Sequence, residues 1–333
     1  MNVGILTKSG IDKLDTRSVM DVEAYRRTCK VTDLVSFPRI YDHMDVIRVM
    51  NLNAVVPALK WRVLAGPPFV LTLGYDHAGL ARLAGKRGKA LAWTVLRKVA
   101  CRWAAGIVVS AWGLEQRWSI GVRYPEVPLR IIPNGVPLDK FWRADKSGRA
   151  SSHTEVVTLG RLSPEKNLVT LLFALGRVQE HGVQVRLTMY GEGPERPLLA
   201  KIAKELDLRV AMPGLIPYDK VPGALRDADI FCIPSWSEGS PKALWEAMAC
   251  GMPCVVSTGV PDARQYPCWQ HHPGDVGGLT ASIEVAIEAL GGWNGRGVRA
   301  SMEKHHDLNR TIADEITFTR LAATKAGYGY GSD

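Results

Sequence analysis

The sequence predicts an α/β protein in which helices cover parallel sheets. Short apolar runs of strand length alternate with longer segments of helical periodicity, a pattern typical of parallel sheets with crossover helices. The chain has 333 residues, enough for two domains of ordinary size. Hydrophobic residues make up 46% of it, which is typical of a globular protein.

The first part of the chain begins with a strand. Strands are expected at 3–7, 31–37, 45–50, 68–73 and 106–110. A long helix is expected at 86–104, because four apolar residues recur there near helical spacing: Trp93, Leu96, Val99 and Trp103. Four basic residues are available to its polar face: Lys89, Arg97, Lys98 and Arg102. The polar segment 143–153 then indicates a linker between domains.

The second part repeats this alternation more regularly. Strands are expected at 155–159, 184–190, 209–213, 229–233 and 254–257. Helices are expected at 166–181, 195–206, 219–226 and 242–249, and a last one at about 311–326. Ligands of such sheets lie beyond the carboxyl ends of the strands, so the loops that follow the strands are the candidate site.

One loop, between the strand at 229–233 and the helix at 242–249, carries a distinctive pair of carboxylates. Glu238 lies on the loop, and Glu246 lies further along the helix. Pro241 stands where a first-turn proline is tolerated, since the first N–H groups of a helix have no internal partner. Free N–H groups converge at such a helix start and bind anions. We interpret this segment as a site for a nucleotide sugar.

This segment is one of five blocks that occur in a recognisable order. The others are IIPNGVPLDKF (131–141), TLGRLSPEKNL (158–168), MYGEGPE (189–195) and MPGLIP (212–217). Together the blocks resemble the signature of retaining nucleotide-sugar glycosyltransferases of the GT-B fold, glycosyltransferase family 4. The N-terminal third of the chain matches that family poorly.

The resemblance implies two Rossmann-like domains that face each other across a cleft. Residues 1–145 would bind the acceptor and residues 146–310 the nucleotide-sugar donor, with residues 311–333 forming a C-terminal helix and tail that cross back toward the first domain. The implied activity is transfer of a sugar from a UDP- or GDP-sugar to a hydroxyl group, with retention of configuration.

The resemblance also assigns donor-site roles. Glu246 would accept hydrogen bonds from the ribose hydroxyls, and Glu238 would contact the transferred sugar. The phosphates would lie at the helix start, at Gly239, Ser240, Pro241 and Lys242, and would meet the free N–H groups there, to which Pro241 contributes none. Leu215 and Ile216 resemble the loop that contacts the base, although ordinary turn-flanking residues would look the same. Gly10, in Lys8-Ser9-Gly10, stands where the family has a double-glycine loop.

The departing diphosphate requires stabilisation of its growing negative charge, and fixed cations provide it in a water-poor site. Arg161 directly follows the strand at 155–159, and Lys166 opens the next helix five residues later. Both side chains can therefore point to the same place. Gly160 would let the backbone approach the ligand closely. We predict that Arg161 and Lys166 clamp the diphosphate.

Candidate catalytic groups in the first domain are Asp76 and His77. The family often has a histidine after the fourth strand, and this chain has Gly74-Tyr75-Asp76-His77-Ala78-Gly79 there. In a retaining reaction the departing phosphate can take the proton of the acceptor, so no protein base is required. If Asp76 were a true general base, an inverting outcome would have to be considered.

No metal or other cofactor is expected beyond the nucleotide-sugar co-substrate. Asp227 and Asp229 have D-x-D spacing but match a helix end and a buried strand, so we interpret them as structural. His271 and His272 lack a third ligand and indicate a loop. The six cysteines, at 29, 101, 232, 250, 254 and 268, form no C-x-x-C pair and are typical of buried thiols in a reducing cytosol.

Charge separates the two halves of the chain. Residues 1–145 hold 22 Lys and Arg against 12 Asp and Glu, whereas residues 146–333 hold 20 against 21. The half assigned to the acceptor is therefore the half suited to bind a negatively charged partner, unless its surplus of Lys and Arg merely favours solubility. No run approaches the ~20 apolar residues of a membrane span, and the first residues indicate a strand, not a signal peptide.

Two kinds of acceptor fit this charge distribution. The first is a lipid-linked or cell-envelope glycan, with the basic face of the helix at 86–104 docked on anionic headgroups. The second is a hydroxymethylated base in DNA, flipped out while the same face holds phosphates. The expected location is the cytoplasm, at the inner membrane face for a lipid-linked acceptor or on DNA for a modified base. A sugar-nucleotide epimerase and a non-catalytic sugar-nucleotide binder remain as alternative functions.

Overall fold

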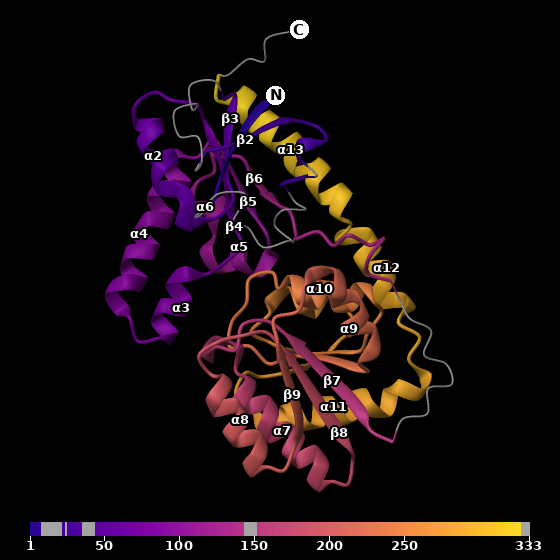
Figure 1. Cartoon of the computed structure of the whole chain (residues 1–333). Coiled ribbons are helices and arrows are strands. Elements are labelled where there is room, and N and C mark those ends of the chain that lie inside the picture. The colour runs from indigo at the N-terminus through magenta and orange to yellow at the C-terminus, as the bar shows by residue number, and fades with distance from the viewer. Residues whose placement is uncertain (8–21, 24, 35–43, 143–151, 328–333) are drawn as a thin grey trace. The chain divides into compact units, whose positions relative to one another are not determined.

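The computed structural model describes residues 1–7, 22–23, 25–34, 44–142 and 152–327 of the chain (Figure 1). The chain divides into two compact units. The first comprises Met1–Gly135 and Leu308–Asp333, and the second comprises Val136–Asp307. These divisions fall earlier than the expected boundaries after residues 145 and 310. Most of the expected linker, residues 143–151, lies outside the described residues.

The described part of the first unit contains a parallel sheet of six strands in the order β2-β1-β3-β4-β5-β6. The strands are β1 Asn2–Leu6, β2 Lys30–Asp33, β3 Val46–Val49, β4 Phe69–Leu73, β5 Gly106–Val109 and β6 Leu129–Ile131. The α-helices are α2 Val55–Val63, α3 His77–Leu83, α4 Arg87–Trp103, α5 Trp112–Trp118, α6 Ile120–Arg123 and α13 Leu308–Lys325.

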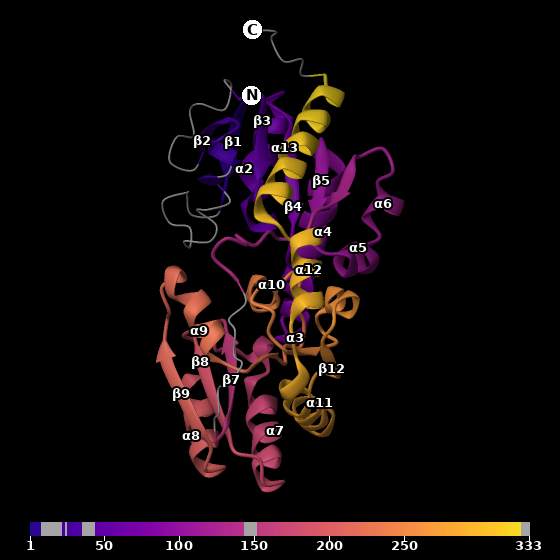
Figure 2. The ribbon, with the colours of Figure 1, turned by 90° about the vertical axis from the view of Figure 1, so that its right-hand side faces the viewer.

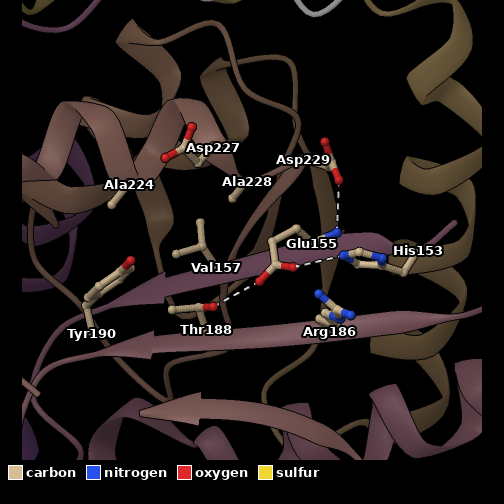
Figure 3. A pocket seen from close by; sticks show the side chains of 10 residues that line it. All are labelled: His153, Glu155, Val157, Arg186, Thr188, Tyr190, Ala224, Asp227, Ala228 and Asp229. Atoms are coloured by element: carbon tan, nitrogen blue, oxygen red, sulfur yellow. Dashed lines mark hydrogen bonds and ion pairs between the residues drawn. The ribbon is translucent and has the colours of Figure 1, made fainter. Parts of the chain in front are cut away.

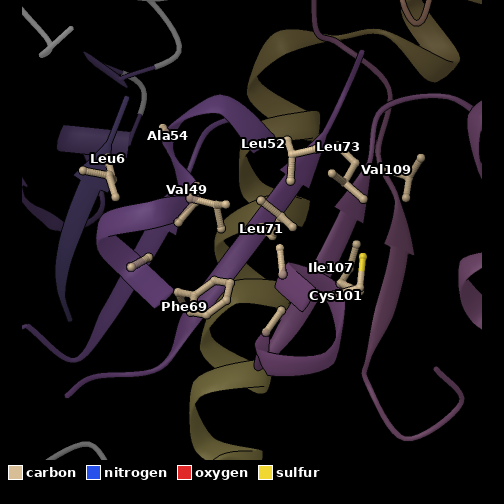
Figure 4. Packing of buried hydrophobic residues seen from close by; sticks show 14 of the residues in the cluster. Leu6, Val49, Leu52, Ala54, Phe69, Leu71, Leu73, Cys101, Ile107 and Val109 are labelled. Carbon is tan, nitrogen blue, oxygen red and sulfur yellow. The ribbon is translucent and has the colours of Figure 1, made fainter. Parts of the chain in front are cut away.

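Helices cover both faces of this sheet. Alternate residues of β4 point in opposite directions: Phe69, Leu71 and Leu73 pack with residues of α2, α4 and α5 (Figure 4), whereas Val70 packs with α13. Helix α13, yellow in Figures 1 and 2, lies along β3, β4 and β5. Strands buried on both faces require nearly continuous apolar sequence, which explains runs such as Phe69–Leu73.

The described part of the second unit has the same architecture, with strand order β12-β11-β10-β7-β8-β9. The strands are β7 Thr154–Leu159, β8 Val185–Tyr190, β9 Arg209–Gly214, β10 Ile230–Ile233, β11 Cys254–Ser257 and β12 Trp269–His271. The α-helices are α7 Leu168–Glu180, α8 Arg196–Glu205, α9 Val221–Asp227, α10 Lys242–Ala249, α11 Val276–Ala289 and α12 Arg296–His305. Helices α7, α8 and α11 pack on one face, and α9, α10 and α12 pack on the other.

The α/β fold class is confirmed, and most expected elements are present. The helix at 242–249 and the strand at 254–257 agree to the residue. Lys166 does not open a helix; it ends a short 3₁₀ helix, Pro164–Lys166, because Asn167 has a positive φ of 54° and α7 begins only at Leu168. The expectation of a loop at His271 is also wrong, since this residue ends strand β12 and is buried.

Elements with weak sequence signals were missed. Helix α2 contains a proline, and α3, α5 and α6 are short. Helix α11 begins with a glycine pair, and the side chain of Asp275 caps it by accepting from Gly278 N at 2.9 Å. The four apolar residues that indicated helix α4 do not share one buried face, since Trp93 and Leu96 pack against the core whereas Val99 and Trp103 are exposed.

A charged network inside the first unit attaches α13 to the sheet. Arg48 on β3 is fully buried, and its Nη2 lies 3.1 Å from Glu315 Oε1 on α13. Arg48 also donates to Val70 O and to the hydroxyl of Tyr25, which in turn donates to Glu315 at 3.0 Å. Burial, together with the Glu315 carboxylate, raises the pKa of Tyr25. These partners compensate a charge that would otherwise be costly to bury.

Replacement of Glu315 by alanine should therefore destabilise the protein by about 3 kcal/mol or more, because it leaves Arg48 buried without a counter-ion. Tyr25→Phe removes one hydroxyl and should cost about 1 kcal/mol. Urea unfolding followed by circular dichroism measures both effects. Asp314→Ala, at the exposed neighbouring position, is the matched control. Equal stability of the Glu315 and Asp314 variants would contradict this account.

Candidate functional site

Four of the five sequence blocks supply loops that follow strands of the second sheet at its carboxyl edge, whereas the block at 131–141 follows β6 of the first sheet. Gly160 follows β7, Gly191 follows β8, and the loop from Pro234 to Pro241 joins β10 to α10. Strands β7 and β8 pair through Leu159 and Tyr190, so the loops after them start side by side. This edge is where ligands bind in parallel α/β sheets.

Lys166 and Glu238 meet at this edge. Lys166 Nζ lies 2.5 Å from Glu238 Oε1, although 72 residues separate them in sequence. The Ser235 hydroxyl donates to the same oxygen at 2.9 Å, and Glu238 N donates to Gly259 O at 3.0 Å. Glu238 is buried, so these contacts fix its carboxylate in one orientation. The structure thus brings together two predicted site residues that come from different blocks.

Gly160 lies directly beneath this pair. A Cβ atom at Gly160 would stand 3.6 Å from Lys166 Cε and 3.8 Å from Nζ, and the φ of 151° is one that other residues rarely adopt. Arg161, the next residue, is exposed and forms no ion pair with another described residue. The guanidinium of Arg161 and the ammonium group of Lys166 are therefore carried by residues five apart in sequence, next to one glycine, and the arginine is available to a ligand.

Sequence reasoning missed two glycines that fix the shape of this site. A Cβ atom at Gly191 would stand 1.8 Å from Gly160 O, and one at Gly193 would stand 2.1 Å from Leu162 O. The backbones of the two loops are in direct contact, with Leu162 N donating to Glu192 O at 3.0 Å. The MYGEGPE block already contained the signal, because its glycines follow a strand in the same way as Gly160 does.

The start of α10 forms the other side of the carboxyl edge. Pro241 immediately precedes Lys242, the first helical residue, and Pro241 O accepts from Leu244 N at 3.0 Å. Ser240 Oγ accepts a hydrogen bond from Trp245 Nε1 at 2.9 Å, which ties the loop after Gly239 to the helix. The first N–H groups of this eight-residue helix are oriented toward the loop, where an anion would be stabilised.

Glu246 is buried on the second turn of α10 and accepts a hydrogen bond from the Tyr218 hydroxyl at 3.0 Å. Tyr218 was not predicted, because the contact joins segments 28 residues apart. It lies in the segment that follows β9. In the same segment Leu215 is highly exposed, whereas Ile216 packs against the core that α10 covers. The segment with the predicted base-contact residues therefore reaches the helix that carries Glu246.

Asp76 and His77 belong to the first unit and have local partners. Asp76 caps α3 by accepting from Gly79 N at 3.0 Å, and its other oxygen lies 3.1 Å from Arg117 Nη1. The His77 ring stacks on Trp93 with centroids 4.6 Å apart. Burial lowers the pKa of His77, although Asp76 opposes the shift. Gly10 lies outside the described residues.

Three of the four basic residues assigned to the acceptor face are exposed on α4: Lys89, Lys98 and Arg102. Arg97 is not. Its guanidinium lies over the Trp118 ring, 4.6 Å from the centroid, and burial lowers its pKa. Its place on the polar face is therefore wrong, because the polar end of its side chain lies against an aromatic ring.

A separate polar cavity of about 490 Å³ lies on one face of the second sheet (Figure 3). Asp227 and Asp229 line it, and Asp229 Oδ2 accepts from Glu155 N at 2.9 Å, which supports a structural role for the D-x-D pair. Thr188 donates to Glu155 at 2.9 Å (Figure 3). In the described part of the chain, no three His, Cys, Asp or Glu residues are grouped to hold a metal, and no helix is long and apolar enough to cross a membrane.

The geometry agrees with comparisons to known proteins. The family model "Glycosyl transferases group 1" matches residues 141–267. Residues 141–267 of this chain therefore resemble the group 1 glycosyltransferases. The putative colanic acid biosynthesis glycosyltransferase WcaL of Escherichia coli is 38% identical over 149 residues, which cover 41% of this chain and 36% of WcaL.

A further relative is the GDP-mannose-dependent alpha-(1-6)-phosphatidylinositol dimannoside mannosyltransferase of Mycobacterium tuberculosis. It is 35% identical over 133 residues, which cover 38% of this chain and 34% of that protein. The matched part thus spans about a third of the length of these curated relatives.

Solved structures show that the fold is GT-B. Sucrose-phosphate synthase of Thermosynechococcus elongatus superposes with a TM-score of 0.81 at 14% identity, covering 98% of this chain and 100% of that one. Anabaena HepE, solved in complex with UDP-glucose, superposes with a TM-score of 0.76 at 19% identity, covering 95% and 99%.

The contact between the two glycine loops can be tested directly. Gly191→Ala should destabilise the protein by about 3 kcal/mol, because the added methyl group would overlap Gly160 O at a strained φ of 140°. Gly297→Ala in α12 is the control, since its added methyl group would meet no atom within 4 Å. It should be neutral or stabilising. Thermal unfolding of both variants measures the difference, and similar melting temperatures for the two variants would contradict the close contact between the loops.

Proposed function

We propose that the protein transfers a glycosyl group from a nucleoside diphosphate sugar to a hydroxyl group of an envelope glycan or glycolipid. The observation that carries this proposal is the pair formed by half-buried Lys166 and buried Glu238 beside Gly160, at the carboxyl edge that also holds Glu246. The matched relatives include a mannosyltransferase named for a GDP-mannose donor and a phosphatidylinositol dimannoside acceptor. Their names supply the donor and acceptor classes of this proposal.

In this proposal the diphosphate binds between cations and helix N–H groups. The Lys166 ammonium has three donors, so its bond to Glu238 leaves two for phosphate oxygens. The Arg161 guanidinium and the start of α10 at Lys242 provide further positive potential. All of these groups are in place before charge develops on the leaving group, which is the arrangement that lowers the barrier.

The two carboxylates hold the remaining parts of the donor. Glu238 has a fixed orientation and accepts from hydroxyls of the transferred sugar, whose position relative to the phosphate it thereby sets. Glu246, held by Tyr218, accepts from the ribose hydroxyls. Leu215 and Ile216 contact the base through their backbone. Each carboxylate thus serves one end of an elongated ligand.

The reaction proceeds with retention and needs no protein base. The bond from the anomeric carbon to the phosphate oxygen breaks, and the acceptor oxygen bonds to that carbon on the same face. The hydroxyl proton passes to the departing phosphate oxygen, which completes the nucleoside diphosphate. Asp76 remains the candidate base of an inverting alternative, but its cap and its pairing with Arg117 give it a structural role in any case.

Loss of either member of the Lys166–Glu238 pair should nearly abolish transfer. Glu238→Gln and Lys166→Ala should each lower kcat by about 10²–10³-fold, because each removes a preorganised contact to charge or hydroxyls in the transition state. Nucleoside diphosphate release is the measurement, with circular dichroism to confirm folding. Lys201→Ala, from the exposed Lys201–Glu205 pair, is the matched control. Turnover near that of the control in either variant would remove the pair from the site.

The acceptor class can be separated from the donor site. With UDP- and GDP-sugars as donors, we expect nucleoside diphosphate release in the presence of a polyprenyl-diphosphate-linked or phosphatidylinositol-linked sugar, with a matching mass increase in that acceptor. Hydroxymethylated duplex DNA should give none. Release with the DNA alone would identify a DNA-modifying enzyme. Release without any acceptor and with epimerised sugar would identify an epimerase.

A further inference from the structure

We propose that helix α4 of the first unit is an interfacial docking helix that inserts an apolar row of side chains into an anionic membrane surface. The row consists of Leu91, Val95, Val99 and Trp103. This inference rests on the proposed function only in that an envelope acceptor lies at such a surface. The row itself is a property of the described helix.

The row is exposed along the length of the helix. Its residues are four apart, so they follow one another on one side of α4. They retain 66%, 51%, 42% and 47% of their accessible surface, respectively. Single exposed apolar residues are ordinary, but four in one row on one helix are an apolar patch.

The fold buries this row only in part. Helix α4 packs against the sheet through the buried residues Ala90, Ala100 and Cys101, supported by Trp93 and Leu96. Exposed apolar residues also occur on the two helices that contact α4, namely Leu83 at the end of α3 and Val63 at the end of α2.

Basic side chains accompany the row, and the helix itself carries no acidic residue, although Arg102 forms an exposed ion pair with Glu126 at 3.4 Å. Lys98 and Arg102 are exposed one turn apart on the same side of the helix. The sequence contains no Asp or Glu from residue 77 to residue 114. Long basic side chains can lie along apolar surface and place their charge at headgroup level. The combination is that of a helix lying in an anionic interface.

An anionic bilayer accounts for both components, whereas nucleic acid accounts for one. Lys98 and Arg102 would serve phosphates of either partner, since phosphate contacts require only cations and donors. The apolar row has no counterpart on a DNA backbone. At a bilayer it lies beside acyl chains while the basic side chains reach headgroup phosphates. Membrane docking is therefore the interpretation that uses every exposed side chain of the row.

Flotation of the full chain with vesicles tests this without any glycosyl transfer. The protein should bind vesicles of phosphatidylcholine with phosphatidylglycerol at physiological salt, and bind phosphatidylcholine alone much more weakly. Combined Leu91→Gln, Val95→Gln and Val99→Gln should weaken binding ~10-fold or more, since the apolar row is lost. Lys98→Gln with Arg102→Gln should weaken it ~10-fold as well, and only on anionic vesicles.

The matched control is Leu321→Gln with Arg320→Gln and Lys325→Gln on α13, which packs on the opposite face of the sheet. It should bind like the unchanged protein. Absence of anionic-vesicle binding, or equal loss in the control, would overturn the proposal. So would binding that the apolar substitutions leave intact, because it would show electrostatic adhesion alone. Tighter binding to duplex DNA would replace the membrane with nucleic acid. A vesicle-binding protein without transferase activity would instead refute only the proposed function.

Discussion

The direct contact between the loops after β7 and β8 is the constraint on which the donor site depends. Gly191 and Gly193 leave no room for a side chain against Gly160 O and Leu162 O, so the two backbones approach as closely as backbones can. This contact fixes the path of the chain from Gly160 to Lys166. The ammonium group consequently lies above Gly160 and within reach of Glu238. A site for a diphosphate needs such preorganisation, in which a rigid backbone holds the charged side chains in place before the ligand binds.

In the first unit, a buried ion pair helps to attach helix α13 to the sheet. This sheet would leave one face open where α13 packs, and α13 comes from the far end of the sequence. Apolar contacts of Ile312, Ile316 and Phe318 provide most of the attachment. The Arg48–Glu315 contact adds a requirement for one particular register, since a shift of α13 along the sheet would leave the buried guanidinium without its carboxylate.

The donor half was predictable because its signals are local. Glycines and prolines mark the ends of the strands and the start of α10, and the five blocks occur in order, so the positions of Glu238 on the loop and Glu246 on α10 followed from the sequence, whereas Lys166 ends a 3₁₀ helix instead of opening α7. The contacts that hold these side chains in place did not follow from the sequence. Tyr218 reaches Glu246, and Gly191 meets Gly160, only because β-strand pairing brings distant segments together. Such contacts are set by tertiary structure, of which a linear pattern carries no record.

Helix α4 shows why the acceptor half resisted the same reasoning. It has apolar residues on two sides, so its periodicity is compatible with either side facing the sheet. Trp93 and Leu96 face inward, whereas Leu91 and Val95 face outward, and Arg97 follows the inward side to reach Trp118. A buried apolar row is explained by the fold alone. A row that the fold buries only in part is not fully explained in this way, and the explanation of its exposed portion lies in what the surface meets.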